Sequence, residues 1–410
     1  MTGWPEVQLS QLGSGGRAFA MGPFGSRIKK ENFRSSGVPV LRGKNLGGNR
    51  FDDSDVVFVD EDKAEELSAS IARPGDLVFT HRGTLGQVAL VPRRPRYPLY
   101  LVSQSQMKAT IDEERVLPEY VYYWFCSPEG QHALLRNTSQ TGVPAISQPL
   151  TSLQAIAIPV PPLSEQRAIA EVLGALDDKI EANRSQIDLL ESLIRASWED
   201  ASSESAEWLQ QPISEVAKIV GGSTPRTSVA DYWDGSISWA TPKDLSRLTS
   251  TPLFRTERSI TEQGLQQISS GLLPRGTVLL SSRAPIGYLA IAEVPLAINQ
   301  GFIALNSLGA VPNLYLWQWV AHHMAEIKDR ANGTTFQEIS KANFRPIGFD
   351  TPPARVIDQW MNAAEPLYQL VVKLEYETSI LATLRDTLLP KLMSGELRVR
   401  DAEHLVEDAV

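Results

Sequence analysis

Basic side chains gather near the start of the chain, in a composition suited to contact with a nucleic acid. Six of them fall within 18 residues that hold one acid, Glu31: these are Arg27, Lys29, Lys30, Arg34, Arg42 and Lys44. Lysine suits sequence-independent contact with phosphate, whereas a rigidly held arginine fork can bond the O6 and N7 atoms of guanine. Such residues also form ordinary solvated surface, so the cluster predicts DNA contact without deciding which residue makes it.

Amide and arginine side chains further along the chain extend this set, because Asn and Gln are the types that read adenine edges. Arg82 and Arg283 each follow a strand-like run and precede a turn of small residues. Hydrogen bonds from these arginines to turn carbonyls would explain them equally well. The predicted DNA-binding residues are Arg27, Lys29, Lys30, Arg42, Lys44, Asn45, Arg82, Gln104, Arg226, Lys243, Arg283 and Gln300.

Signatures of catalysis and of metal binding are missing from the sequence. It contains no GxxxxGK[ST] phosphate loop, no GxGxxG after a strand, no HExxH and no GxSxG. The five histidines show no ligand spacing, and the single cysteine, Cys126, is expected to be a buried structural thiol. We therefore predict no catalytic residue, no metal site and no cofactor in this chain, and we expect a binding and positioning role.

A heptad pattern over residues 163–197 predicts a long helix of about 50 Å, from a rise of about 1.5 Å per residue. Its apolar seam consists of Ile169, Leu173, Leu176, Ile180, Asn183, Ile187, Leu190 and Ile194. A buried Asn183 either fixes the register of a coiled coil or marks a local break in the helix, and the sequence does not decide between the two. The neighbouring Asp177 and Asp178 read as a solvated face.

A second helical stretch, after residue 353, is the expected partner of the first. Its seam includes Leu367, Val371, Leu374, Leu381 and Leu388, and it is weakened by Thr378 and Arg385. Pro366 predicts a kink or break. The acidic tail after Gly395 is expected to be loose.

An internal repeat at an offset near 200 residues relates the two remaining parts of the chain. KNL at 44–46 matches KDL at 243–245, and GDLVFTHRGTLGQVALV (75–91) matches GTVLLSSRAPIGYLAIA (276–292). The predicted organisation is a first domain (1–160), a helical spacer (161–207), a second domain (208–353) and a C-terminal helix with its tail (354–410). The fold class is α+β: two mixed α/β domains separated by two long helices that form an antiparallel coiled coil.

The net charge of −9 is unevenly distributed along this organisation. Residues 1–160 and 211–350 each carry +1, whereas residues 161–210 carry −7 and residues 351–410 carry −4. The excess acid thus lies in the helices, which leaves the two domains free to approach phosphate.

Several motifs together resemble the specificity subunit of type I restriction–modification systems. They are VPVLRGKNL, GPFGSRIKKENF, NQGF, GTTFQEIS, PPLSEQRAIAEVLGALDDKI and LLPKLMSGEL, and they span almost the whole chain. In that family each domain is a target recognition domain that reads one half of a split DNA sequence. The resemblance implies that the coiled coil spaces the two halves and docks two copies of a methyltransferase subunit, with restriction subunits as optional further members.

The resemblance also implies that S-adenosylmethionine belongs to the methyltransferase, which flips an adenine out of the duplex. We expect a non-catalytic, cytoplasmic protein without a membrane segment, because no apolar run approaches the ~20 residues that a span needs. The alternative from another class is a structural adaptor whose domains bind proteins. That alternative predicts no salt-dependent DNA binding. A nuclease or methyltransferase acting alone is a third, more distant alternative.

Overall fold

The computed structural model describes residues 3–139, 142–203, 208–333 and 337–407. The chain forms two compact units: residues 1–179 together with 380–410, and residues 180–379. The boundary between the units therefore cuts through both long helices. Each half of a helix packs with one domain, instead of forming a separate spacer.

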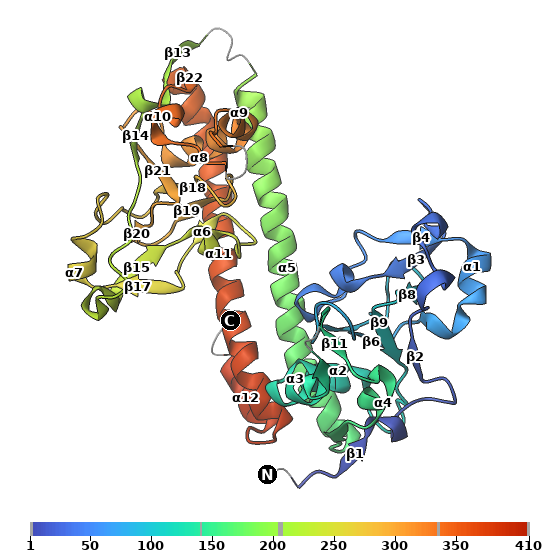
Figure 1. Ribbon diagram of the computed structural model, residues 1–410. Coiled ribbons are helices and arrows are strands. Elements are labelled where there is room, and N and C mark those ends of the chain that lie inside the picture. The colour runs from blue at the N-terminus through green and yellow to red at the C-terminus, as the bar shows by residue number, and fades with distance from the viewer. Residues whose placement is uncertain (1–2, 140–141, 204–207, 334–336, 408–410) are drawn as a thin grey trace. The chain divides into compact units, whose positions relative to one another are not determined.

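The first domain contains two four-stranded sheets (Figure 1). One sheet has the order β2 (Phe19–Met21), β9 (Gln106–Ala109), β6 (Leu77–Thr80), β7 (Val88–Leu90). The other has the order β4 (Val57–Val59), β3 (Val38–Leu41), β8 (Tyr100–Val102), β5 (Ile71–Ala72). These strands are short and rich in Val, Leu and Phe, and most of their side chains are buried, whereas those of β2 are partly buried.

Helices and paired strands complete the first domain. The helices are α1 (Glu61–Glu66), α2 (Pro118–Cys126), α3 (Pro128–Leu135) and α4 (Pro149–Gln154), and one of the strand pairs is β10 (Thr138–Ser139) with β11 (Ala145–Ile146). Proline opens α2, α3 and α4, where its missing amide hydrogen costs nothing. Helix α2 covers β7, and its Phe125 ring lies 4.9 Å from that of Phe79.

The second domain repeats this plan with longer strands. Its larger sheet has the order β14 (Ala217–Val220), β21 (Phe302–Ser307), β18 (Val278–Ser281), β19 (Leu289–Ala292), β16 (Pro252–Leu253). A three-stranded sheet has the order β17 (Arg258–Ile260), β15 (Trp233–Ala240), β20 (Leu296–Ile298). The helices are α6 (Pro242–Leu245), α7 (Glu262–Leu265), α8 (Asn313–His322), α9 (Met324–Asp329) and α10 (Lys341–Phe344).

Strand pairing confirms the repeat that the sequence predicted. The hairpin β6–β7 pairs with β9 as the hairpin β18–β19 pairs with β21. The strand β3 pairs with β8 in parallel, and β15 pairs with β20 in the same way. In each domain the first strand also pairs with the last: β1 (Glu6–Gln8) with β12 (Ala157–Pro159), and β13 (Leu209–Pro212) with β22 (Gly348–Thr351).

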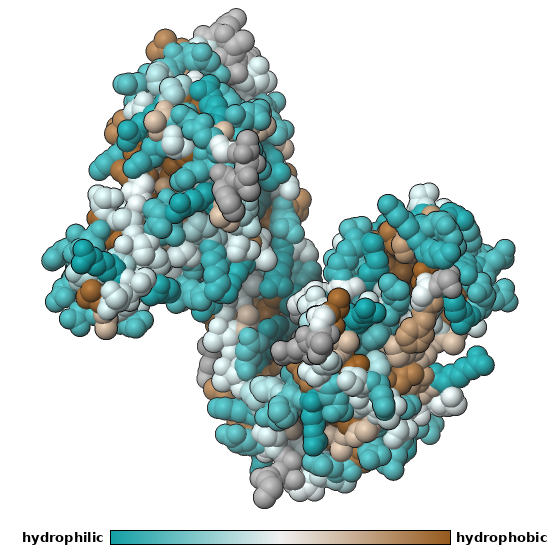
Figure 2. All heavy atoms as spheres, in the orientation of Figure 1, coloured by the Kyte–Doolittle hydropathy of each residue, from teal (hydrophilic) through white to brown (hydrophobic). Residues whose placement is uncertain are grey.

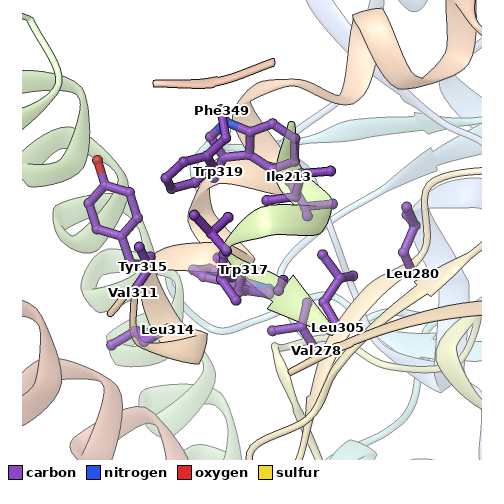
Figure 3. Close-up of a cluster of buried hydrophobic side chains, with 14 of the residues drawn as sticks. Ile213, Val278, Leu280, Leu305, Val311, Leu314, Tyr315, Trp317, Trp319 and Phe349 are labelled. Carbon is purple, nitrogen blue, oxygen red and sulfur yellow. The ribbon is translucent and has the colours of Figure 1, made fainter. Parts of the chain in front are cut away.

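The core of the second domain is aromatic and includes parts of both long helices. Figure 3 shows Tyr315, Trp317 and Trp319 of α8 lying among side chains from β18, β21 and Phe349. The same core contains Ile194 and Trp198 from one long helix and Trp360 from the other. The Trp360 indole donates a hydrogen bond to the Ser197 hydroxyl (3.1 Å), which joins the two helices at this point.

The two long helices are α5 (Leu163–Ala201) and α11 (Ala354–Met393), and they are antiparallel within each unit. Asp177 contacts Arg385 in the first unit, and Asn183 contacts Glu377 in the second. The seam residues are buried, except for Leu190 and Leu367, which are partly buried: Ile169, Leu173, Leu176, Ile180, Asn183, Ile187, Ile194, Val371, Leu374, Leu381 and Leu388. The predicted fold class of two α/β domains with an antiparallel coiled coil is confirmed.

Two local expectations about the helices, at Pro366 and after Gly395, are wrong, and the alternatives left open for Asn183 are decided. No break occurs at Pro366, because α11 is continuous through it; the proline and Asn362, four residues earlier, are exposed, so water can satisfy the freed carbonyl. Asn183 does not mark a break, because α5 is also continuous. The segment after Gly395 is not loose, since it forms α12 (Val399–Glu407), which buries Val399 and Ala402.

The outer surface is mostly hydrophilic in the view of Figure 2, with hydrophobic side chains in scattered patches. Within the described ranges, no helix combines the length and the apolar character that crossing a membrane requires.

Candidate nucleic-acid interface

A polar cavity of about 500 Å³ in the first domain brings together half of the predicted DNA-binding residues. It lies between the loops that follow β3, β6 and β8, and its lining also contains Ile28 and Phe33. The predicted residues that line it are Lys29, Lys30, Arg42, Lys44, Arg82 and Gln104. The described lining contains five cationic side chains and no carboxylate, so the electrostatic environment favours an anionic or acceptor-rich ligand.

The turn over residues 43–49 presents Arg42 and Lys44, and Asn45 holds this turn in place. The Asn45 side chain accepts from the Arg42 amide (2.9 Å) and donates to the carbonyls of Asp52 (2.9 Å) and Asp55 (3.1 Å). Only 1% of Asn45 is exposed. The prediction that Asn45 reads a base is therefore replaced by a structural role, because its amide is already used by the main chain.

Arg42 has a buried hydrogen-bond donor that is available to a ligand. Its Nε is buried and has no hydrogen-bond partner among the described residues. An unsatisfied buried donor costs free energy, of the order of 1–3 kcal/mol, unless something binds to it. Lys44 differs, because it forms an ion pair with Asp55, whose pKa the Lys44 ammonium lowers through a hydrogen bond and its charge.

Three uncharged side chains form the inner wall of the cavity and were not among the predicted residues. The Gln106 amide donates to the Thr80 hydroxyl (3.2 Å), which donates to Oε1 of Gln87 (2.8 Å). Gln106 and Thr80 are buried. Gln87 lies next to Gly86 in the internal repeat at residues 75–91, but no spacing rule identifies it as a contact residue. It reaches Thr80 because β6 and β7 form a hairpin.

His81 and Gln104 meet at the rim of the cavity. The His81 ring lies 3.1 Å from the Gln104 carbonyl. Burial, with the nearby Arg82 charge, lowers the pKa of His81, so the ring is neutral at neutral pH. The side chains of Arg82 and Gln104 are exposed, and both remain available to a ligand.

Arg27 lies outside the cavity lining, 3.9 Å from Glu66 on α1. Lys29 lies 3.6 Å from Glu31, so its charge is partly compensated. Lys30 lines the cavity and has no acidic partner within the described parts of the chain. The basic cluster seen in the sequence thus divides into four residues that line the cavity and two, Arg27 and Arg34, that do not; Arg34 pairs with Asp60 (3.0 Å).

The predicted residues of the second domain are more compensated by acids. Lys243 pairs with Glu257 (2.9 Å), and Arg283 lies 3.9 Å from Glu338. Gln300 accepts a hydrogen bond from Thr224, and Arg226 is exposed. Two of these four residues therefore lie beside a carboxylate, in contrast to the carboxylate-free lining of the cavity in the first domain.

Asp177 of α5 is not the solvated side chain that the sequence indicated. Its carboxylate contacts Arg385 of α11 (2.7 Å) and Arg50 (3.5 Å), and it accepts from the Tyr123 hydroxyl (3.0 Å). Burial, together with this carboxylate, raises the pKa of Tyr123, which keeps the hydroxyl protonated as a donor. Arg385 therefore does not weaken the helix pair, because it helps to attach the loop that carries Lys44 to both helices of the first unit.

The chain contains two topologically equivalent domains, of which one has a cationic cavity, and both are joined to long paired helices. This combination defines a nucleic-acid recognition protein. Among the described residues, no group of three or more His, Cys, Asp or Glu side chains could hold a metal ion. The sequence matches the family described as "Type I restriction modification DNA specificity domain" over residues 21–192 and again over residues 206–364. The chain belongs to this family, as its motifs indicated.

Individual relatives agree with this assignment. The type I restriction enzyme MjaIX specificity subunit of Methanocaldococcus jannaschii is 39% identical over 148 residues, which is 36% of this chain and 34% of that protein. The putative MjaX specificity subunit of the same organism is 21% identical over 90% of both chains. The EcoR124I/EcoR124II specificity subunit of Escherichia coli is 25% identical over 63% of this chain and 64% of its own.

A solved structure shares the fold. The crystal structure of the type I restriction–modification system S subunit from M. genitalium superposes with a TM-score of 0.60, at 15% identity, and covers 95% of this chain and 96% of that one. The predictions of a specificity subunit and of a non-catalytic role in DNA recognition are confirmed at the level of the family.

Proposed function

We propose that this protein reads an asymmetric, bipartite DNA target and positions methyltransferase subunits to methylate an adenine within it. The first domain binds one half-site and the second domain binds the other. The domains share their strand pairing but differ in the side chains that they present, which is the arrangement expected for two unlike half-sites.

The observation that carries this proposal is the cavity lining of the first domain. Five cationic side chains converge there without a lining carboxylate, and Arg42 presents a buried donor without a partner in the described structure. Phosphate contacts by the lysines would fix the position of the duplex, and groups deeper in the cavity would then read base edges.

The methyl donor and the reacting groups belong to the partner in this proposal. Two copies of a methyltransferase subunit dock on the chain, each beside one domain, and restriction subunits join them for cleavage. Exposed leucines on α5, Leu189 (61% exposed) and Leu193 (47%), offer an apolar docking strip on an otherwise acidic helix. We place the assembly in the cytoplasm, where it meets chromosomal DNA.

The test is methylation-sensitive sequencing of a host that expresses this chain with its methyltransferase partner. We expect one split adenine-methylated motif, and we expect replacement of residues 1–160 by another recognition domain to change one half of it only. Absence of a split motif, or a motif unchanged by the replacement, would refute the proposal.

The alternative role as a protein-binding adaptor has a direct discriminating experiment. Simultaneous replacement of Arg27, Lys29, Lys30 and Lys44 by Ala should abolish methylation if the first domain binds DNA. An adaptor would keep its function in this variant, and its complex would show no salt-dependent affinity for DNA.

A further inference from the structure

The two domains provide an internal comparison of the positions around the cavity, because their strands have the same register. Thr80 pairs with Gln106 in the first domain, and Ser281 pairs with Phe302 in the second. The Thr80 amide donates to the Gln87 carbonyl (3.0 Å), as the Ser281 amide donates to the Tyr288 carbonyl (2.8 Å). Each position around the first cavity therefore has a defined counterpart in the second domain.

Some of these positions carry the same residue in both domains. Lys44 corresponds to Lys243, Arg82 to Arg283, and Gln104 to Gln300. A side chain that is present in both domains cannot by itself distinguish two unlike half-sites. These shared residues are suited to contacts with the DNA backbone, which carry no sequence information.

Three other positions differ in chemistry between the domains. Arg42 corresponds to Thr241, since the backbone amide of each donates the same turn hydrogen bond, to the side chain of Asn45 and of Asp244 respectively. Gln87 corresponds to Tyr288, and Gln106 corresponds to the buried Phe302. The first domain thus places an arginine and two amides where the second places a hydroxyl and two aromatic rings.

A directed hydrogen-bond chain fixes which end of Gln87 faces the cavity. The Ser103 hydroxyl donates to Oε1 of Gln106, the Gln106 amide donates to Thr80, and the Thr80 hydroxyl donates to Oε1 of Gln87. The acceptor of Gln87 is therefore used. Its Nε2 makes no hydrogen bond within the described residues and remains a donor to whatever enters the cavity.

The groups around Gln87 are donors as well. Arg42, Lys30 and Arg82 line the same cavity and carry no acceptor on their side chains. In the major groove, guanine is the base that presents two acceptors, N7 and O6, whereas adenine and cytosine each present an amino donor. These donors match the two acceptors of guanine, meet an amino donor on adenine or cytosine, and find a single acceptor, O4, on thymine.

We propose that Gln87, oriented by Thr80 and Gln106 and acting beside Arg42, reads the major-groove edge of a guanine in the half-site bound by the first domain. This inference rests on the proposed function, because it names the base contact through which that function becomes sequence-specific. Gln87 and Arg42 touch the base, whereas Thr80 and Gln106 are positioning residues.

The test uses the complete complex of this chain with its methyltransferase subunits and duplexes modified at single guanines of the first half-site. Replacement by 7-deazaguanine removes the N7 acceptor, whereas replacement by inosine keeps both N7 and O6. At one guanine, we expect 7-deazaguanine to weaken binding roughly ten- to hundredfold, and we expect inosine to leave it unchanged.

Protein variants then assign this contact. Gln87→Glu keeps the shape and the acceptor that Thr80 needs but removes the donor, so the penalty for 7-deazaguanine should disappear. Gln104→Glu, a matched change at a position shared by both domains, should retain the penalty. Discrimination at the second half-site, measured on the same complexes, shows that each variant is folded.

The inference is overturned if the first half-site contains no guanine, if no 7-deazaguanine weakens binding, or if Gln87→Glu retains the full penalty. In all of these cases methylation would still be sequence-specific. Failure of the proposed function gives a different result, in which the complex methylates no split sequence and neither half-site discriminates between bases.

Discussion

Lys30 shows how a single residue contributes affinity without specificity. It lines the cavity of the first domain and has no acidic partner in the described structure, so its charge is available to phosphate. Gln87, in contrast, is held in one orientation by the hydrogen bond that it accepts from Thr80. A cation without an acidic partner and a fixed amide donor in one cavity separate the attraction of DNA from the reading of its sequence.

Lys30→Gln should weaken binding to all DNA sequences by a similar factor. The slope of log K against log salt should fall by about 0.9, the contribution of one phosphate contact. Affinity measured at several salt concentrations checks this prediction. Lys63→Gln is the matched control, because Lys63 pairs with Glu66 on α1 outside the cavity lining; an equal loss in both variants would contradict a specific role for Lys30.

His81 predicts a dependence of stability on pH. Its pKa is lowered in the folded protein, mainly by burial, whereas the unfolded chain takes up a proton near the usual pKa of about 6.5. The free energy of unfolding is therefore not reduced by His81 above that pH, and it declines as the pH falls below it. Denaturant titrations between about pH 5 and 8 should show a weaker decline for His81→Gln than for the unchanged chain; identical pH profiles would refute the assignment.

At the scale of elements, a buried polar pair in the seam of the coiled coil joins α5 to α11. Asn183 is fully buried and donates to the Glu377 carboxylate (2.9 Å), while its Oδ1 has no partner within the described residues. A misaligned pairing would bury the amide against apolar side chains at a cost in free energy. The interaction therefore favours one register of the helix pair.

A double-mutant cycle measures this pair. Asn183→Ala and Glu377→Ala should show a coupling of about 1.5–3 kcal/mol, the range for hydrogen bonds to charged groups, in the free energy of unfolding. Additive effects would show that Asn183 contributes nothing specific to the register. Asp188→Ala with Glu377→Ala provides the control, because Asp188 is exposed on α5 and should not couple.

Leu189 and Leu193 lie one helical turn apart on α5 and are exposed. If they form the docking strip, replacing both by Glu should lower the affinity for the methyltransferase subunit by tenfold or more, because roughly 1.5–3 kcal/mol is gained for each leucine that is fully buried. DNA binding by the first domain should persist. Gln186→Glu, on an exposed position of the same helix, should leave assembly unchanged; retained assembly in the double variant would place docking elsewhere.

The same elements show what the sequence could predict. A seven-residue period identifies both helices and their seam without any structure, since spacing alone decides which side chains share a face. Pro366 and Asp177 were misread because local rules do not include solvent access to a freed carbonyl, or partners that are distant in the sequence. The wall formed by Thr80, Gln87 and Gln106 was missed for a related reason: it exists only once three strands are in register.

For the whole molecule, the organisation into two units follows from how the helices are shared. Gln166 at the start of α5 accepts from the Leu117 amide (2.7 Å), while Ile194 and Trp198 near its end belong to the core of the second domain. Each domain is thus stabilised by helix segments from two distant parts of the chain. Each unit contains residues from both halves of the sequence.

The pairing of the first strand of each domain with its last strand has a consequence for inheritance. β1 lies against β12, and β13 lies against β22, so the chain enters and leaves each domain at neighbouring points. A foreign segment of different length and sequence can be joined at those points while the start of the following helix stays where it is. Recombination at these paired ends would therefore exchange one domain at a time, and we expect each exchange to create a new DNA target in a single genetic event.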